Sequence, residues 1–203
     1  MADQCPFCNF DSVKSSAVLE SKYFYAIPTI GQISDGGHML VIPRNHYACL
    51  GSMDDSKFDE FESITKKVKQ AVTNTYSKPI LFEHGILGQS VPHAHLQIMP
   101  SDTDLFSRIN SDFKMFRRFT SMRELQNLHK SKGVYLFYQN QQDEMFGFLL
   151  DSYPQYLRIV AAESIGKPKR GNWREWRADA DCAKLDDKLI AETIKKLKQE
   201  LNQ

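Results

Sequence analysis

The chain has 203 residues, of which 41% are hydrophobic and 25% are charged, and its formal net charge is +1. This composition is typical of one globular domain with a sizeable core, and the nearly balanced charge excludes binding to nucleic acid or membranes through overall charge, while leaving room for a local basic patch. No basic segment followed by an apolar run opens the chain, and no apolar run approaches the roughly 18 residues of a membrane span, so we expect a cytoplasmic protein with reduced cysteines and no membrane partner.

The first half of the chain predicts strands around one helix. Apolar runs bounded by turn residues predict strands at 23–27, 38–43 and 78–85. Apolar residues spaced by three and four predict a helix over 54–76. Glycine and serine then favour a tight turn between 85 and 90.

The stretch VPHAHLQIMP, residues 91–100, has the alternation of a strand. On a strand, His93, His95 and Gln97 would share one face, because successive side chains point to opposite sides. The alternation by itself fits equally well a half-buried strand with a polar outer face. A function for these residues therefore needs other parts of the chain.

The second half predicts more helices and strands. Apolar periodicity favours a second helix over 103–130, three strands at 133–139, 145–150 and 155–162, and a last helix from Leu185 onward. The tail at 166–181 is polar and reads as irregular. The pattern predicts an α+β fold with a largely antiparallel sheet, packed helices and a C-terminal helical extension. We place the boundary near 163–172, which gives a domain at 1–162 and a C-terminal segment at 163–203.

The stretch CPFC puts Cys5 and Cys8 at the spacing of zinc ligands. Tetrahedral zinc needs two more ligands, and the six histidines of the chain are candidates. A redox role would need a thioredoxin-like βαβ setting, which the sequence does not predict. The alternative is that both cysteines are small apolar residues near the N-terminus.

Several stretches together resemble the histidine triad (HIT) superfamily. They are GHMLVIPRNHYACL, a helix, and then GQSVPHAHLQIMP. Members carry His-x-His-x-His, whereas this chain has glutamine at the third position, which resembles the branch of galactose-1-phosphate uridylyltransferases and diadenosine tetraphosphate phosphorylases. FEHG at 82–85 followed by SVPHAHLQ is similar to the uridylyltransferase pattern, and YFYAIPTIGQ with GHMLVIPRNHY looks like CwfJ-type domains. The resemblance covers roughly residues 5–100 and implies a HIT-like fold, with 1–162 as a nucleotide-binding catalytic domain.

The resemblance implies that His95 attacks the α-phosphorus of a nucleotide and forms a covalent nucleotidyl-histidine. Gln97 would stabilise charge on an oxygen, since an amide cannot act as an acid. This favours a nucleotidyltransferase or phosphorylase acting on a nucleoside phosphate anhydride or ester. Two alternatives remain open: a HIT-type hydrolase of dinucleoside polyphosphates or nucleoside phosphoramidates, and a CwfJ-like protein that processes or binds RNA.

The same resemblance assigns other residues. Ser90, Gln89 and His84 would contact phosphate, although Ser90 also fits an ordinary turn and His84 a surface position. Three residues would belong to the nucleoside pocket: Ile27, Pro28 and Thr29.

A structural zinc ion is also implied, held by Cys5, Cys8, His46 and His93, which form a closed Cys₂His₂ set. The alternative is that His46 caps the helix entry and His93 bonds to backbone. Family members commonly form homodimers, so a homodimer is expected as well.

The stretch GKPKRGNWREWR interleaves five cations with Trp173 and Trp176. Such a segment can stack a base and bind phosphate. It would close over the active site or contact RNA, and RNA is the less favoured partner. The alternative is a basic loop whose tryptophans pack on the core.

Overall fold

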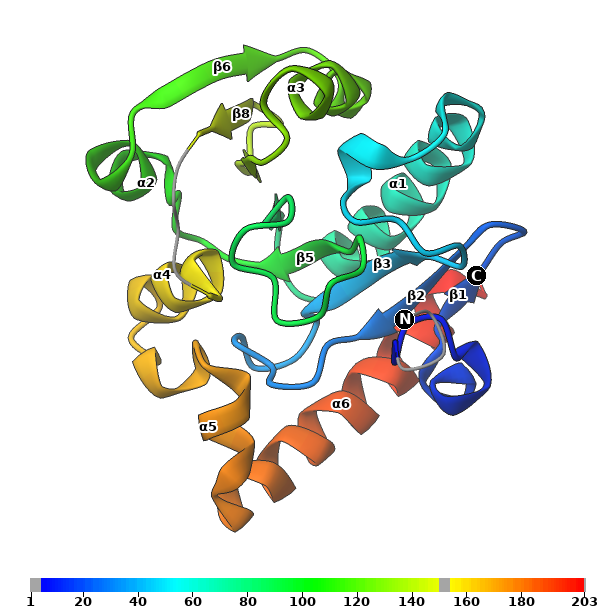
Figure 1. Ribbon diagram of the computed structural model, residues 1–203. Helices are drawn as coiled ribbons and strands as arrows, with labels where there is room; N and C mark the ends of the chain where they lie inside the picture. The colour runs from blue at the N-terminus through cyan, green and yellow to red at the C-terminus, as the bar shows by residue number, and fades with distance from the viewer. Residues whose placement is uncertain (1–4, 150–153, 203) are drawn as a thin grey trace.

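An antiparallel sheet organises the computed structural model, which describes residues 5–149 and 154–202 (Figure 1). Its eight strands follow the order β1-β2-β3-β5-β4-β7-β8-β6. Each neighbouring pair runs antiparallel. The strands are β1 Leu19–Glu20, β2 Phe24–Pro28, β3 Met39–Pro43, β4 Pro79–Glu83, β5 Leu96–Pro100, β6 Met115–Phe119, β7 Leu136–Gln139 and β8 Met145–Phe148. The predicted α+β class is confirmed.

Helices pack on this sheet and extend beyond it. They are α1 Phe58–Thr75, α2 Phe106–Asp112, α3 Leu125–Lys132, α4 Tyr156–Ser164, α5 Trp173–Ala178 and α6 Ala180–Leu201. Helix α6 lies against α1 and β2 (Figure 1). Across the described ranges, no helix combines the length and the apolar character needed to cross a membrane.

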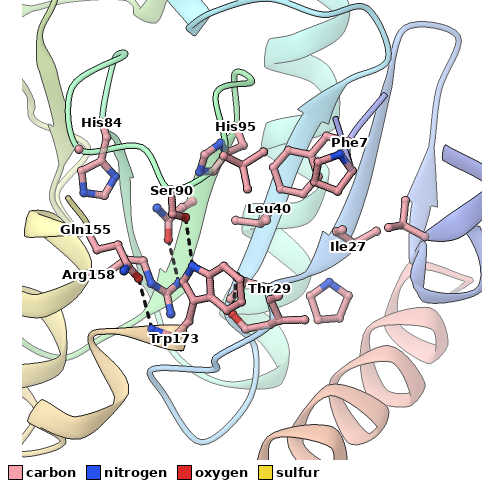
Figure 2. Close-up of a pocket in the computed structure, with 17 residues that line it drawn as sticks. Phe7, Ile27, Thr29, Leu40, His84, Ser90, His95, Gln155, Arg158 and Trp173 are labelled. Atoms are coloured by element: carbon pink, nitrogen blue, oxygen red, sulfur yellow. Dashed lines mark hydrogen bonds between the residues drawn. The ribbon is translucent and has the colours of Figure 1, made fainter. Parts of the chain in front are cut away.

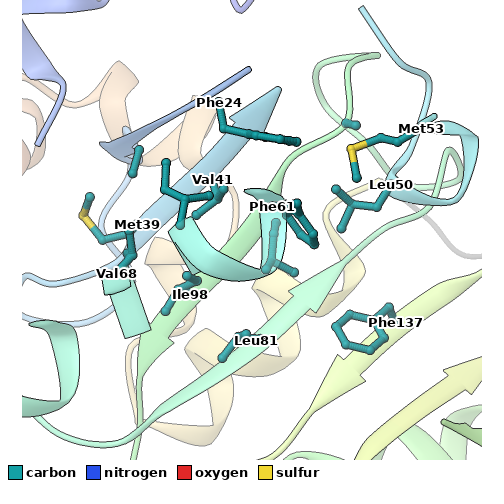
Figure 3. Packing of buried hydrophobic residues seen from close by; sticks show 14 of the residues in the cluster. Phe24, Met39, Val41, Leu50, Met53, Phe61, Val68, Leu81, Ile98 and Phe137 are labelled. Carbon is teal, nitrogen blue, oxygen red and sulfur yellow. The ribbon is translucent and has the colours of Figure 1, made fainter. Parts of the chain in front are cut away.

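One face of the sheet carries the largest apolar cluster (Figure 3). Alternate strand residues such as Val41, Ile98, Leu81 and Phe137 belong to this cluster. The apolar stripe of α1, which includes Phe61, packs onto them. Burial of these side chains supplies the main stabilising free energy of the fold, at roughly 1.5–3 kcal/mol for each large one.

The opposite face is covered in two separate parts. Residues of α2 and α4 pack on β4, β7 and β8, and the N-terminal turns at 10–16 pack on β2 and β3. Gln97 lies on this face between the two parts, with Leu40 and Phe82 as its register partners on the neighbouring strands. Between α4 and the N-terminal turns, a strip of this sheet face is left uncovered. Gln97 of β5 lines a cavity there.

The predicted helix over 103–130 is wrong. The segment forms α2, then the edge strand β6, then α3. The Asn110 side chain accepts a hydrogen bond from the Met115 amide, and β6 pairs with β8. Ser121 then caps the next turn by accepting from the Arg123 amide. Pairing between distant strands therefore overrides a periodicity that is compatible with a helix.

The predicted strand over 155–162 is also wrong, because these residues form most of α4. Short apolar runs do not distinguish a buried strand from a buried helix. The strand predicted over 91–100 begins only at Leu96, so His93 and His95 lie in the preceding loop. That loop spans 84–95 and is longer than the predicted tight turn.

The other predicted elements are confirmed within a few residues. They are the strands at 23–27, 38–43, 78–85 and 133–139, the helix at 54–76 and the last helix. The strand predicted at 145–150 is β8, and its final residue lies outside the described ranges. The tail predicted as irregular contains the short helix α5.

Candidate functional site

A cavity of about 270 Å³ opens on the sheet face between α4 and the N-terminal turns (Figure 2). Polar residues such as His84, Gln155 and Arg158 lie at one end, and the apolar Phe7 and Ile27 lie at the other. The remaining lining residues are Pro6, Val13, Pro28, Thr29, Ile30, Leu40, Gly88, Ser90, Val91, His95, Gln97 and Trp173. The cavity therefore suits a ligand with one charged and one apolar part.

His95 lines this cavity with its orientation fixed by backbone. Its Nδ1–H donates to the His93 carbonyl at 2.7 Å. The proton of the neutral ring is thereby placed on Nδ1, and Nε2 keeps its lone pair. Burial lowers the pKa of His95, and the charge of Arg158 lowers it further. His95 is therefore a neutral imidazole at pH 7, the state that a nucleophile needs.

Arg158 is a charged lining residue that the sequence analysis did not identify. It lies on α4, is only 4% exposed, and donates through Nη1 to Gln97 Oε1 at 3.2 Å and through Nη2 to the Gly31 carbonyl at 2.5 Å. Burial lowers its pKa to about 10, so the guanidinium is still charged at neutral pH. The available signal was a single arginine inside the apolar run 155–162. Prediction of this run as a strand gave no reason to place that arginine at the site.

His84 is buried rather than on the surface. Its Nε2 accepts a hydrogen bond from the Leu157 amide at 3.0 Å, so its ring proton lies on Nδ1. Burial lowers its pKa to about 3, with contributions from His95 and Arg158. His84 is thus a neutral residue at the polar end of the cavity.

Ser90 lines the cavity beside a residue of α5. The Trp173 indole Nε1–H donates to Ser90 Oγ at 3.0 Å, and Arg174 Nη2 donates to the Ser90 carbonyl at 3.0 Å. Gln89 lies outside the cavity lining, and its side chain donates to the Ala48 carbonyl. The structure therefore brings Ser90 but not Gln89 to the site.

The apolar end of the cavity lies between β2 and the N-terminal turns. Three residues that the sequence assigned to the nucleoside line this end: Ile27, Pro28 and Thr29. The Phe7 ring also lines it and contacts the His95 ring edge-on, with ring centroids 5.5 Å apart. A planar apolar group would thus lie next to His95.

Behind His95 lies a cluster of four metal-ligand types, Cys5, Cys8, His46 and His93, whose ligand atoms are all within 4.8 Å of one another. Sulfur–nitrogen distances are 3.4 Å for Cys5–His93 and 3.3 Å for Cys8–His46. A tetrahedral zinc ion would separate S and N ligands by roughly 3.6 Å, given its bond lengths. His93 Nε2–H donates to the Pro43 carbonyl at 2.8 Å, which leaves Nδ1 facing the sulfurs.

The thiol of Cys8 is not a thiolate by itself. Burial, with a smaller contribution from the neighbouring Cys5, raises the pKa of Cys8 to about 11. A divalent cation reverses this, because it binds the thiolate and displaces the proton. The donor set and the spacing both fit a zinc ion.

Three cations of the stretch 166–177 form ion pairs. Lys167 and Arg170 both pair with Asp35. Arg177 pairs with Asp186 and Asp187 on α6. The pairs with Asp35 hold the tail against the loop 30–37, and the pairs of Arg177 connect α5 to α6.

The loop after β2 is fixed by α6 as well. Asp186 is fully buried and accepts hydrogen bonds from the amides of Gly31 and Gln32, at 2.8 and 2.7 Å. Gly31 has a φ of +70°, and a Cβ there would lie 2.4 Å from the Cβ of Trp173. Only glycine therefore allows the loop and α5 to approach so closely.

Comparison with known sequences gives three matches. The HIT domain model matches residues 11–104. Adenosine 5'-monophosphoramidase HNT1 of Saccharomyces cerevisiae is 32% identical over 100 residues, covering 47% of this chain and 61% of the yeast protein. CWF19-like protein mug161 of Schizosaccharomyces pombe is 24% identical over 176 residues, covering 79% of this chain and 29% of that protein. The chain thus spans less than two thirds of either relative.

Solved structures include similar chains. A HIT family protein from Bacillus anthracis is 24% identical, with a TM-score of 0.45, and the match covers 64% of this chain and 96% of that one. A Zn-bound histidine triad family protein from Mycobacterium smegmatis is 22% identical, with a TM-score of 0.42, and the match covers 64% and 94%. The family-model match and the two sequence relatives thus make residues 11–104 similar to a HIT domain, and these residues include the His-x-His-x-Gln motif beside the cavity.

Proposed function

We propose that the protein is a nucleotidyltransferase or phosphorylase that acts on a nucleoside phosphate anhydride or ester through a covalent nucleotidyl-His95 intermediate. The observation that carries this proposal is the 2.7 Å contact from His95 Nδ1 to the His93 carbonyl, which leaves the lone pair on Nε2 of a residue that lines the cavity. A neutral, oriented imidazole facing a cavity of nucleotide-compatible character is a nucleophile for phosphorus.

Each step uses residues of this chain. Nε2 of His95 attacks the α-phosphorus, and the bond from phosphorus to the leaving oxygen breaks with its electron pair on that oxygen. The Nδ1 proton stays on the His95 ring, and its hydrogen bond to the His93 carbonyl stabilises the positive charge that develops there. In the second step an acceptor oxygen attacks phosphorus, and the P–N bond breaks to restore the lone pair of Nε2.

The two ends of the cavity divide the substrate. The nucleoside would occupy the end lined by Ile27, Pro28 and Thr29, and the phosphates the end with Ser90 and His84. Gln97 has an amide, which stabilises an oxygen but cannot protonate it. An acceptor that is itself a phosphate needs no deprotonation, and this favours transfer or phosphorolysis over hydrolysis.

Cys5, Cys8, His46 and His93 would hold a zinc ion. A four-ligand set leaves no open position, so the ion would be structural. Its role would be to attach the N-terminal turns to the loop that carries His95, which keeps Phe7 against the reactive ring.

RNA binding is the second candidate, because the CWF19-like relative aligns over 79% of this chain. The paired state of Lys167, Arg170 and Arg177 weighs against it, since these cations already have carboxylate partners. Binding to RNA would show a steep dependence on salt.

The test is intact-protein mass spectrometry after brief incubation near pH 7 with diadenosine tetraphosphate, UDP-glucose or ATP, without acidification. We expect a nucleotidyl adduct with the wild-type protein and none with His95→Ala. His129→Asn, on α3 outside the cavity, is the matched control and should keep the adduct. No adduct and no turnover with all three substrates, together with salt-sensitive RNA binding, would favour the second candidate.

A further inference from the structure

Arg158 is a buried charge without a direct ionic partner among the described residues. Its hydrogen bonds within the described residues go to uncharged acceptors: Gln97 Oε1, the Gly31 carbonyl and, at 3.4 Å, the Gly171 carbonyl. Asp186 attracts it only through space. A buried cation is costly unless an anion compensates it. Because this guanidinium lines the cavity, the missing anion is expected to come from the ligand.

The contact with Arg158 also sets the direction of the Gln97 amide. Oε1 accepts from the guanidinium, so the amide NH₂ is directed elsewhere and is the group of Gln97 that can donate. Gln97 lies two residues after His95 and lines the same cavity. Arg158 therefore offers a cation, and Gln97 a neutral donor, to an oxygen near the phosphorus that His95 would attack.

Neither of the two other histidines near Arg158 is an acid at neutral pH. Burial holds the pKa of His84 at about 3 and that of His38 well below its usual value, and Arg158 lowers both further. His84 Nε2 is also occupied by the Leu157 amide. Among the described lining residues, the end of the cavity with His84 and Arg158 thus contains donors and positive charge, but no side chain that releases a proton easily.

This arrangement favours cleavage of one kind of bond over another. When an anhydride P–O bond breaks, the leaving phosphate takes the electron pair as a stable anion and needs no proton. When a phosphoramidate P–N bond breaks, the departing alkylamine takes the electron pair and must also gain a proton, because an amide anion is far too basic to leave. Electrostatic stabilisation therefore accelerates the first reaction and not the second.

We infer that Arg158, acting partly through Gln97, makes the protein selective for nucleoside phosphate anhydrides over nucleoside phosphoramidates of alkylamines. This inference rests on the proposed function and names its substrate class. Arg158 acts as a positioning residue for Gln97 and as the cation that compensates the leaving phosphate.

The experiment compares kcat/KM for diadenosine tetraphosphate with kcat/KM for adenosine 5'-phosphoramidate of lysine. For the wild-type protein we expect a preference for the anhydride of about 100-fold or more, the size of effect given by one preorganised charge-stabilising group. Gln97→His places an imidazole at the leaving oxygen and should reduce this preference at least tenfold. Arg158→Gln should lower kcat for the anhydride by about 10²-fold while changing the phosphoramidate rate much less.

Arg108→Gln is the matched control, since this arginine is exposed on α2 and pairs with Asp112. Its preference should equal that of the wild type, and a purely structural role of Arg158 would slow both substrates equally. Equal turnover of both substrates by the wild type, or an unchanged preference in Gln97→His, would overturn the inference while the nucleotidyl-His95 adduct still forms. Loss of the adduct itself would instead overturn the proposed function. Because Gln97→His leaves Arg158 in place, the inference stays testable if Arg158→Gln fails to fold.

Discussion

The indole of Trp173 donates a hydrogen bond to the hydroxyl of Ser90 across 83 residues of chain, at 3.0 Å. An indole nitrogen can only donate, so the serine oxygen must accept. The hydroxyl proton of Ser90 is therefore left for a second partner, and the cavity is on that side. A residue of the C-terminal segment thus orients Ser90, which under the proposed function would donate its hydroxyl proton to a phosphate.

Replacement of this tryptophan should weaken substrate binding. Trp173→Phe keeps an aromatic wall but removes the donor, so we expect KM for the nucleotide substrate to rise roughly 3- to 10-fold, the value of one net hydrogen bond. Steady-state kinetics on the substrate identified by the adduct experiment measures this. Trp176→Phe is the control, because Trp176 Nε1 has no hydrogen-bond partner in the part of the chain that the structure describes. A similar rise in KM for both variants would contradict the assigned role.

The buried carboxylate of Asp186 should be important for stability. It accepts from two backbone amides and from Arg177, and an amide in its place would set NH₂ against these donors. Asp186→Asn should therefore lower the free energy of unfolding by about 3 kcal/mol. Urea unfolding followed by circular dichroism provides the value. Asp187→Asn removes an exposed partner of the same Arg177 and should cost less than about 1 kcal/mol. Equal losses for the two variants would argue against this account.

Zinc content and stability should be linked. The purified protein should contain one zinc ion per chain by elemental analysis, and Cys8→Ser should abolish it. We expect Cys8→Ser and chelator treatment to lower Tm by roughly 6–12 °C, which corresponds to a loss of about 3 kcal/mol for a chain of this size. Cys182→Ser, outside the cluster, should retain both the metal and the Tm. Wild-type protein purified without zinc, whose Tm does not rise when zinc is added, would rule out a structural metal.

Glu83 should make stability depend on pH. Burial raises its pKa to about 7, although the Tyr135 hydroxyl and the Leu50 amide both donate to it. A carboxyl whose pKa is higher in the folded state stabilises the fold fully below pH 4.5, and this contribution is lost as pH rises through about 7. The loss is about 3 kcal/mol between those limits.

The neutral variant Glu83→Gln removes this titration. Urea unfolding between pH 5 and pH 8 should show that the variant gains stability relative to the wild type as pH rises. Glu192→Gln, at an exposed position on α6, should track the wild type at every pH. A wild type and a Glu83→Gln variant with parallel pH profiles would show that this carboxyl does not titrate in that range.

The sequence brings out cavity residues that lie close together in the chain, and it misses those that lie far from the motif in sequence. His95 and Gln97 lie two residues apart, so their proximity follows from the chain itself. The spacing of Cys5 and Cys8 likewise predicts a pair of metal ligands, and the fold brings this pair to His93. Arg158 came from an apolar run that fits a strand and a helix alike, and only packing against β4 and β7 chose the helix.

Trp173 is different again. The sequence offered three roles for its segment, and the structure brings its side chain to the cavity wall. No spacing rule connects residue 173 to Ser90, because their contact depends on how α4, α5 and α6 stack after the sheet has formed. Local motifs thus identified His95 and Gln97, which line the cavity, while the other walls of the cavity depend on long-range packing.

The hydrogen bonds from Gly31 and Gln32 to Asp186 have a consequence for synthesis on the ribosome. The loop that forms one wall of the cavity is translated early, yet its buried acceptor is translated 154 residues after Gln32. The His-x-His-x-Gln motif can therefore emerge and pair in the sheet while the cavity beside it is still open on one side. The cavity wall would then be completed only after helix α6 has left the exit tunnel, so the proposed activity would begin no earlier than that point of synthesis.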